Sequence, residues 1–164
     1  MILYGAADRT YDYGTAERAL GQMSGIDFKK RGPAFKAELR HLKNSGVPKL
    51  PKPGRGQKVS YTFIQLVELA MALQLTAVGI APKRAATVAL KAGRDIRSAG
   101  NFGERLFIII PPGKEPITVD LDAPENAGIS LRKFTQFWPV YTMIECKRVA
   151  EHVALSLFLS GGLI

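Results

Sequence analysis

Near the N-terminus, apolar residues recur three or four positions apart, as they do on the buried face of an amphipathic helix. The stripe consists of Ala16, Ala19, Leu20 and Met23. Thr15 is a good N-cap for this helix, and Ser24-Gly25 ends it. We therefore predict a short helix that begins at residue 15 and follows an N-terminal tail over residues 1–14.

A second amphipathic helix is predicted from Gly32-Pro33 to about Asn44, with the proline at or near its first turn. Its buried edge has the spacing i, i+4 and i+7 and consists of Phe35, Leu39 and Leu42. A row of cations repeats this spacing one residue later, about 100° round the helix. The row consists of Lys36, Arg40 and Lys43. Two helices joined by a tight glycine-containing turn, with the second one basic outward, form a helix-turn-helix candidate.

The following segment, residues 47–59, contains three prolines and two glycines, which exclude a helix. Its apolar ends, Val47 with Leu50 and Val59 with Tyr61, are predicted to pair as short strands around a Gly54–Gly56 tip. Such a basic hairpin would be a wing that reaches a minor groove or the flanking backbone. A flexible linker is the alternative, but a linker has no need of four cations: Lys49, Lys52, Arg55 and Lys58.

The clearest helix runs from Thr62 to Val78, because Thr62 and Gln65 fit a capping box and Gly79 follows the last apolar position. Its one charged residue is Glu68, so most of this helix is expected to be buried.

Another helix is predicted to start with Pro82 at its first position and to end around 98–100. Its inner side consists of Ala85, Ala86, Val88, Ala89 and Ile96. Lys83 and Arg84 lie in its first turn, where cations oppose the helix dipole, and this suggests that they face a phosphate.

Beyond Gly100 the pattern changes, and residues 99–103 are the predicted domain boundary. Residues 105–110 and 117–122 are predicted to be the two strands of a hairpin. Ser130 would cap a short helix that ends before Pro139, and Val140 to about Ser160 is predicted to be a long terminal helix. The chain is thus divided into a tail (1–14), a DNA-binding domain (15–99) and a hairpin/helix domain (104–164).

The end of the predicted terminal helix is apolar on all sides, which a two-stranded hairpin cannot cover by itself. It either packs back on the N-terminal domain or forms a subunit interface. We favour a homodimer, because paired basic faces suit a two-fold DNA site. The predicted interface consists of Val153, Leu155, Leu157, Phe158 and Leu159.

Two motifs give this order of elements a resemblance to the MerR-type winged-helix family. Residues 39–48, Leu-Arg-His-Leu-Lys-Asn-Ser-Gly-Val-Pro, resemble the family's Leu/Ile-Arg-Tyr-Tyr-Glu-x-x-Gly-Leu-x-Pro segment, and residues 61–66, Tyr-Thr-Phe-Ile-Gln-Leu, resemble its Tyr-Ser/Thr-x-x-Asp-Leu. The resemblance covers residues 15–91 and implies that Arg40 contacts a phosphate or a base. His41 and Leu42 replace the paired tyrosines, so the tyrosine contacts are not carried over. Similar winged helices occur in phage excisionases and small terminase subunits.

Charge is concentrated in one stretch of the 164-residue chain. The formal net charge is +9, and Lys29 to Lys58, with ten basic residues and the single acid Glu38, carries all of it. Unopposed positive charge of this density indicates a polyanion partner, most simply nucleic acid. An acidic membrane surface and simple solubility are the alternatives. RNA is less favoured, because the only aromatic residue in the stretch is Phe35, which is needed in the core.

The sequence offers little for catalysis or metal binding. Cys146 is the only cysteine and is expected to be a buried, inert thiol, and the two histidines, His41 and His152, lie far apart. There is no glycine-rich phosphate loop after a strand and no visible catalytic set, so we expect no enzyme, no cofactor and no metal. Without a secretory signal or an apolar run of roughly 18 residues, a cytoplasmic, nucleoid-associated protein is expected.

We therefore predict an α+β, mostly helical protein, with an N-terminal winged helix-turn-helix and a small C-terminal domain of a β-hairpin plus a long helix. It would bind double-stranded DNA sequence-specifically and regulate transcription. An excisionase-like or architectural factor that acts with recombination machinery, and a protein-interaction adaptor, are the alternatives. The predicted DNA contacts are Lys29, Lys30, Arg31, Lys36, Arg40, Lys43, Lys49, Lys52, Arg55, Gln57, Lys58, Lys83 and Arg84. Arg40 and Lys36 are the best candidates for guanine edges, and Arg55 for a narrow minor groove.

Overall fold

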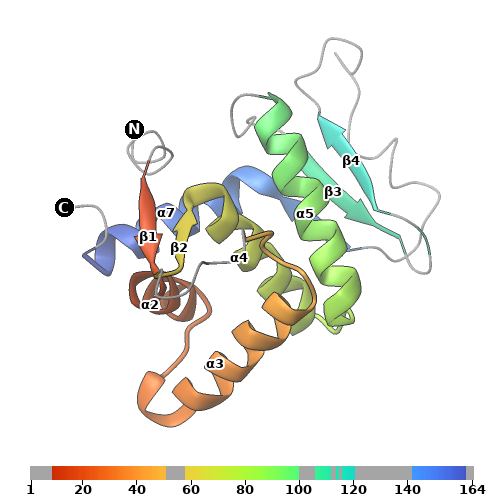
Figure 1. Cartoon of the computed structure of the whole chain (residues 1–164). Coiled ribbons are helices and arrows are strands. Elements are labelled where there is room, and N and C mark those ends of the chain that lie inside the picture. The colour runs from red at the N-terminus through yellow and green to blue at the C-terminus, as the bar shows by residue number, and fades with distance from the viewer. Residues whose placement is uncertain are drawn as a thin grey trace.

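The structure is a computed structural model that describes residues 9–50, 58–99, 106–111, 114, 116–120 and 142–161. The described residues form a mixed α+β fold that is mostly helical (Figure 1). Its elements in chain order are β1 (Thr10–Asp12), α2 (Tyr13–Met23), α3 (Phe28–Asn44), β2 (Ser60–Thr62), α4 (Phe63–Ala77), α5 (Pro82–Ala99), β3 (Leu106–Ile110), β4 (Ile117–Asp120), β5 (Thr142–Glu145) and α7 (Cys146–Leu159).

Helix α4 lies at the centre of the molecule, as its apolar sequence predicts. In Figure 1, α3 lies below it, α5 and the β3–β4 hairpin on one side, and the β1–β2 ribbon and α2 on the other. Ten of its side chains are buried, among them Glu68. The capping box at Thr62 and Gln65 is confirmed, and Gly79 follows the helix with φ +88°, a conformation that glycine adopts without strain.

The predicted wing is wrong in its strand pairing. Residues 60–62 pair with Thr10–Asp12, in the antiparallel register Tyr11↔Tyr61, and Val47–Leu50 form no strand. Both tyrosines are buried, so this ribbon contributes to the core. Part of the expected tail is therefore structured, while the predicted Gly54–Gly56 tip lies outside the described residues.

Aspartates set the starts of the first two helices earlier than predicted. Asp12, rather than Thr15, caps α2: its Oδ1 accepts from the Thr15 N–H at 3.0 Å and its Oδ2 from the Thr15 hydroxyl at 2.9 Å. Asp27 caps α3 by accepting from the Lys29 N–H at 3.0 Å. Because this cap starts the helix at Phe28, Pro33 lies inside α3 and not in its first turn. The predicted end of α3, at Asn44, is confirmed.

Helix α5 begins at Pro82 and ends at Ala99, as predicted, and all five residues of its predicted inner side are buried. The opposite flank holds the C-terminal hairpin: Lys91 Nζ donates to the Pro116 carbonyl at 3.1 Å, and Asp95 accepts from the Thr118 hydroxyl at 2.6 Å.

The C-terminal region is a three-stranded antiparallel sheet in the order β4-β3-β5, followed by α7. The β3–β4 hairpin is confirmed. The long helix predicted from Val140 is wrong in its first part, because residues 142–145 form β5 against β3. Strand β3 is rich in buried isoleucine, so both of its edges need a hydrogen-bonded neighbour. Strand β4 pairs with one edge and β5 with the other. The short helix predicted after Ser130 lies outside the described residues.

Among the described residues, the larger hydrophobic core cluster extends from Tyr11 to Leu157, on both sides of the predicted domain boundary, and Ile109 of β3 and Val119 of β4 form a second, smaller cluster. Helix α7 contacts both α2 and α4 (Figure 1). Described residues of the predicted DNA-binding and C-terminal domains thus pack against each other, and the division into two domains stays a prediction. In the described part of the chain, no helix combines the length and the apolar character needed to cross a bilayer.

Candidate nucleic-acid interface

Helix α3 has one buried edge and one exposed basic edge, as predicted. Phe35, Leu39 and Leu42 are 1–3% exposed and lie in the core. Lys36 and Arg40, one residue further on, are exposed, and Lys43 is partly exposed. The apolar edge fixes the orientation of the helix, so the cations at the next positions are presented outward.

The three cations of this row differ in what holds them. Lys36 Nζ lies 3.4 Å from Glu17 Oε1, and this carboxylate on α2 is nearly buried. Lys43 Nζ lies 5.0 Å from the ring centroid of Tyr13 and 5.3 Å from that of Tyr61, within cation–π range. Arg40 has no ion pair or hydrogen bond with the other described residues, so its guanidinium is the most available of the three.

Tyr13 is the residue that the sequence analysis missed at this site. It lines a hollow with Lys36, Arg40, Lys43 and Asn44, and its side chain is 37% exposed. Burial of part of its ring, followed by the Glu17 charge, raises the pKa of its phenol, so it stays neutral and can donate a hydrogen bond. Tyr13 falls in the predicted tail over residues 1–14. The recognisable signal was Asp12, an N-cap residue three positions before Thr15.

The first turn of α3 carries three further predicted contacts: Lys29, Lys30 and Arg31, all of them exposed. Phe28 anchors this turn. Its ring packs edge-on against Phe35 at 6.0 Å between centroids and also lies over Gly21, where an added Cβ would be 2.1 Å from Phe28 Cζ. Glycine at position 21 therefore allows α2 and the start of α3 to approach closely.

The predicted wing residues do not form one group. Lys58 is exposed and lies beside Asp12 and Tyr13, next to the basic edge of α3. Lys49 instead lines a different hollow between α4 and α5. The remaining members, Lys52, Arg55 and Gln57, lie outside the described residues.

The two cations in the first turn of α5 also differ. Lys83 is exposed. Arg84 donates to the backbone carbonyls of Pro111, at 3.2 Å, and Lys114. Its Nη2 thus ties α5 to the β3–β4 connection, and the predicted phosphate contact of Arg84 stays a prediction.

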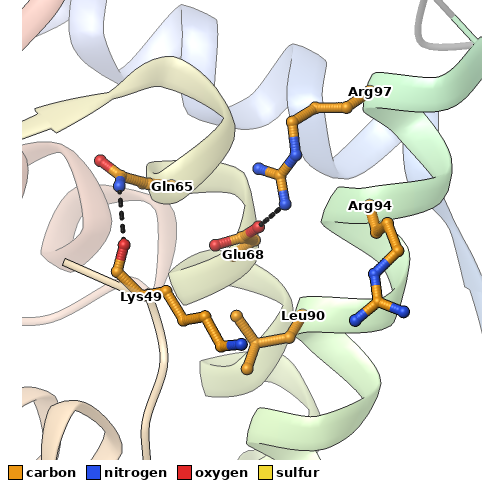
Figure 2. A pocket seen from close by; sticks show the side chains of 6 residues that line it. All are labelled: Lys49, Gln65, Glu68, Leu90, Arg94 and Arg97. Atoms are coloured by element: carbon orange, nitrogen blue, oxygen red, sulfur yellow. Dashed lines mark hydrogen bonds and ion pairs between the residues drawn. The ribbon is translucent and has the colours of Figure 1, made fainter. Parts of the chain in front are cut away.

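The hollow between α4 and α5 contains a second group of cations (Figure 2). It has a volume of about 310 Å³ and is lined by Lys49, Gln65, Glu68, Leu90, Arg94 and Arg97. Arg97 Nη2 lies 3.0 Å from Oε1 of Glu68, whose side chain is 2% exposed. Burial raises the pKa of Glu68, and the neighbouring Arg97 charge opposes that rise. Sequence analysis assigned no role to Glu68, because its partner Arg97 lies on a different helix, α5.

Cys146 is fully buried, as predicted, and burial raises the pKa of its thiol to about 12, which keeps it protonated. Among the side chains that the structure describes, no three His, Cys, Asp or Glu residues gather as metal ligands would.

The predicted dimer interface is divided by the packing of α7. Val153 and Leu157 are 1% and 0% exposed and belong to the core of the same chain, so they cannot form a free interface. Leu155, Phe158 and Leu159 are exposed by 47%, 56% and 59%. Of the five predicted interface residues, only these three are exposed enough to contact a second chain.

No family model, no curated protein and no solved structure matches this chain. The resemblance to MerR-type winged helices therefore stays a prediction that rests on residues 39–48 and 61–66.

Proposed function

We propose that this protein binds double-stranded DNA through the outward edge of α3 and regulates transcription. The observation that carries the proposal is the separation of the two edges of α3: apolar side chains are buried on one, and cations project from the other. A helix presented in this way fits the width of a major groove. The cation density of the surrounding stretch favours a polyanion over a small acidic ligand.

Within this proposal the cations have different tasks. Arg40 reads a base edge, because its guanidinium is free of partners among the described residues and can donate two parallel hydrogen bonds. Lys29, Lys30 and Arg31 neutralise phosphates beside the first turn. Lys43, held above two tyrosine rings, supplies a fixed charge at the other end of the row.

Selection of bound sequences from a random duplex pool, followed by fluorescence anisotropy, tests the proposal. Arg40→Ala should cost about 1–3 kcal/mol on the selected site and much less on random DNA. Arg148→Ala is the matched control, because Arg148 is an exposed arginine on α7. Equal losses from the two variants, or no enrichment of any sequence, would contradict sequence-specific binding. An equal loss from Arg40→Ala on both DNAs would make Arg40 a phosphate contact.

An excisionase-like or architectural role uses the same surface but bends the DNA. Electrophoretic bend analysis on the selected site separates this alternative from plain regulation, which does not require a kinked operator.

A protein-interaction adaptor is the second candidate, and the exposed Leu155, Phe158 and Leu159 at the end of α7 favour it. The same three side chains are what remains of the proposed homodimer interface. Light scattering distinguishes the two: a dimer that dissociates in Phe158→Ser supports self-association. If the wild-type protein is monomeric, the result favours the adaptor, in which these three side chains bind a different protein.

A further inference from the structure

We propose that the hollow between α4 and α5 is a binding site for the phosphoryl group of a small phosphorylated molecule. The proposal does not depend on DNA binding by α3. Its walls come from three segments, with Lys49 after α3, Gln65 and Glu68 on α4, and Leu90, Arg94 and Arg97 on α5 (Figure 2). About 310 Å³ is at the lower end of the range for small-molecule sites, so the ligand is small.

The charge in the hollow is unbalanced. Three cations face one carboxylate, which leaves a net charge of +2 when Glu68 is ionised. Only Arg97 is paired with Glu68; Arg94 and the Lys49 ammonium have no ion pair or hydrogen bond with the described residues. A phosphate monoester carries a charge of about −1.5 to −2 at neutral pH, which matches this surplus better than a monocarboxylate does.

Four of the five cations of α5, all but Lys83, divide into two sets by what they contact. Arg84 and Lys91 donate to backbone carbonyls of the C-terminal hairpin and its connection. Arg94 and Arg97 line the hollow instead; in Figure 2 the Arg97 side chain reaches toward Glu68 of α4, while the Arg94 side chain extends along α5. Since the hairpin is already held by the first set, Arg94 is not needed to fasten it and its guanidinium is available to a ligand.

Hydrogen bonds and close packing hold the walls of the hollow in place. Gln65 Nε2 donates to the Lys49 carbonyl at 3.1 Å, while Gln65 Oε1 accepts from the Thr62 N–H at 2.8 Å, so one side chain holds the Lys49 backbone against the start of α4. Glu68 is a positioning residue that orients Arg97. It fits beneath α5 because residue 93 is glycine, where an added Cβ would lie 2.1 Å from Glu68 Oε1.

Leu90 contributes a feature that suits an organic phosphate, because it gives the hollow an apolar wall beside the cations, where the carbon skeleton of an ester can lie. Glu68 Oε1 is buried and lies 3.0 Å from Arg97 Nη2, so this carboxylate positions the arginine and does not contact the ligand.

Calorimetric titration with inorganic phosphate and with glycerol 3-phosphate, at constant ionic strength, tests this site in the full chain. Saturable binding is expected, tighter for the ester, and weakened at least tenfold by Arg94→Gln and by Lys49→Gln. Lys83→Gln is the matched control, because Lys83 is an exposed cation on the same helix and outside the hollow. Absence of saturable binding, or the same loss in Lys83→Gln, would overturn the proposal. Thermal unfolding of each variant verifies that it is folded.

Duplex-binding measurements on the same variants show whether the hollow binds a free phosphate ester or a phosphate of the DNA backbone. Arg94→Gln should leave the affinity for a selected or random duplex unchanged. If it weakens duplex binding as strongly as Arg40→Ala does, the hollow holds a phosphate of the DNA backbone and the small-molecule proposal fails. If the wild-type protein binds phosphate esters but no duplex, DNA binding by α3 is contradicted, while the phosphate site between α4 and α5 is supported.

Discussion

The outward edge of α3 and the hollow between α4 and α5 both gather cations, but they gather them in different ways. On α3 the charges follow one edge of a single helix, beside the hollow that they line with Tyr13, and among the described residues the ion pair recorded along the Lys36, Arg40 and Lys43 row joins Lys36 to Glu17. In the hollow between α4 and α5, cations from two segments, Lys49 and the arginines of α5, line one space, and Arg97 pairs with the buried Glu68 of α4. A row along one helix suits a long polyanion, whereas cations from separate segments around one space suit a single anionic group. The comparison therefore assigns two kinds of ligand to one basic protein.

Salt should separate the two surfaces most strongly. A duplex that releases counterions from about six phosphates should lose roughly a thousandfold in affinity between 50 and 200 mM salt. A small phosphate has no condensed counterion layer, so ordinary screening should weaken its binding less than about tenfold. Anisotropy with a labelled duplex and calorimetry with glycerol 3-phosphate give the two slopes. Equal slopes would remove the distinction between the two groups of cations.

Gly93→Ala should damage the hollow and leave α3 intact. The new Cβ would lie 2.1 Å from Glu68 Oε1, so the carboxylate must move, and this overpacking should cost about 1–3 kcal/mol of unfolding free energy. Phosphate binding should fall with it, because Arg97 loses its partner. Urea denaturation measures the cost, and duplex binding by the variant is expected to be unchanged.

Gly32→Ala is the matched control for this substitution. Gly32 is also a buried helical glycine, but the nearest atom to its added Cβ is Phe28 Cδ1 at 3.7 Å, an ordinary contact. Removal of glycine from a helix interior stabilises by about 0.5–1 kcal/mol, but Pro33 follows directly and its Cδ crowds the new Cβ. The two effects should offset, so the net change in unfolding free energy should be smaller than the loss at Gly93. Equal destabilisation by both substitutions would show that the loss at Gly93 is not specific to Glu68.

Glu68→Gln should change how stability depends on pH. Because burial raises the pKa of Glu68 above its ordinary value of 4.5, the folded state retains this proton at a pH where the unfolded chain has released it. This group therefore removes stability as pH rises through the window that begins near 4.5 and ends at the folded pKa. Urea denaturation from acid to neutral pH should show the wild type losing stability relative to the variant. A constant difference would mean that Arg97 cancels the effect of burial.

Sequence alone predicted the elements that local chemistry determines. The capping box at Thr62, the proline at the start of α5 and the two edges of α3 depend on spacings within one helix, and all three are observed. What failed depends on distant partners. Nothing near residues 60–62 indicates that they pair with residues 10–12, and nothing near residues 142–145 indicates that they form the third strand beside β3.

The same division holds for the two groups of cations. The α3 row could be read from its spacing, because all its members lie on one helix. The hollow could not, since Lys49, Glu68 and Arg94 come from three segments and meet only in the folded chain. Its tightest fit, between Glu68 and Gly93, joins two helices and leaves no pattern in either sequence. Arg84 is a further example, since its position near a helix start gives no sign of the backbone carbonyls that its Nη2 contacts in the fold.

The smallest expected effect lies within α3 and tests whether its row is as free as the comparison requires. Lys36→Ala removes the contact at 3.4 Å with Glu17, and because the lysine side chain is 55% exposed, the cost should be about 0.5 kcal/mol of unfolding free energy. Arg40→Ala removes no recorded partner and should leave stability unchanged. Urea denaturation of both variants, beside their duplex affinities, separates the two contributions. If Arg40→Ala destabilises the protein as much as Lys36→Ala does, Arg40 has a structural partner. Its effect on DNA would then no longer identify α3 as an open surface, and the contrast with the hollow would weaken.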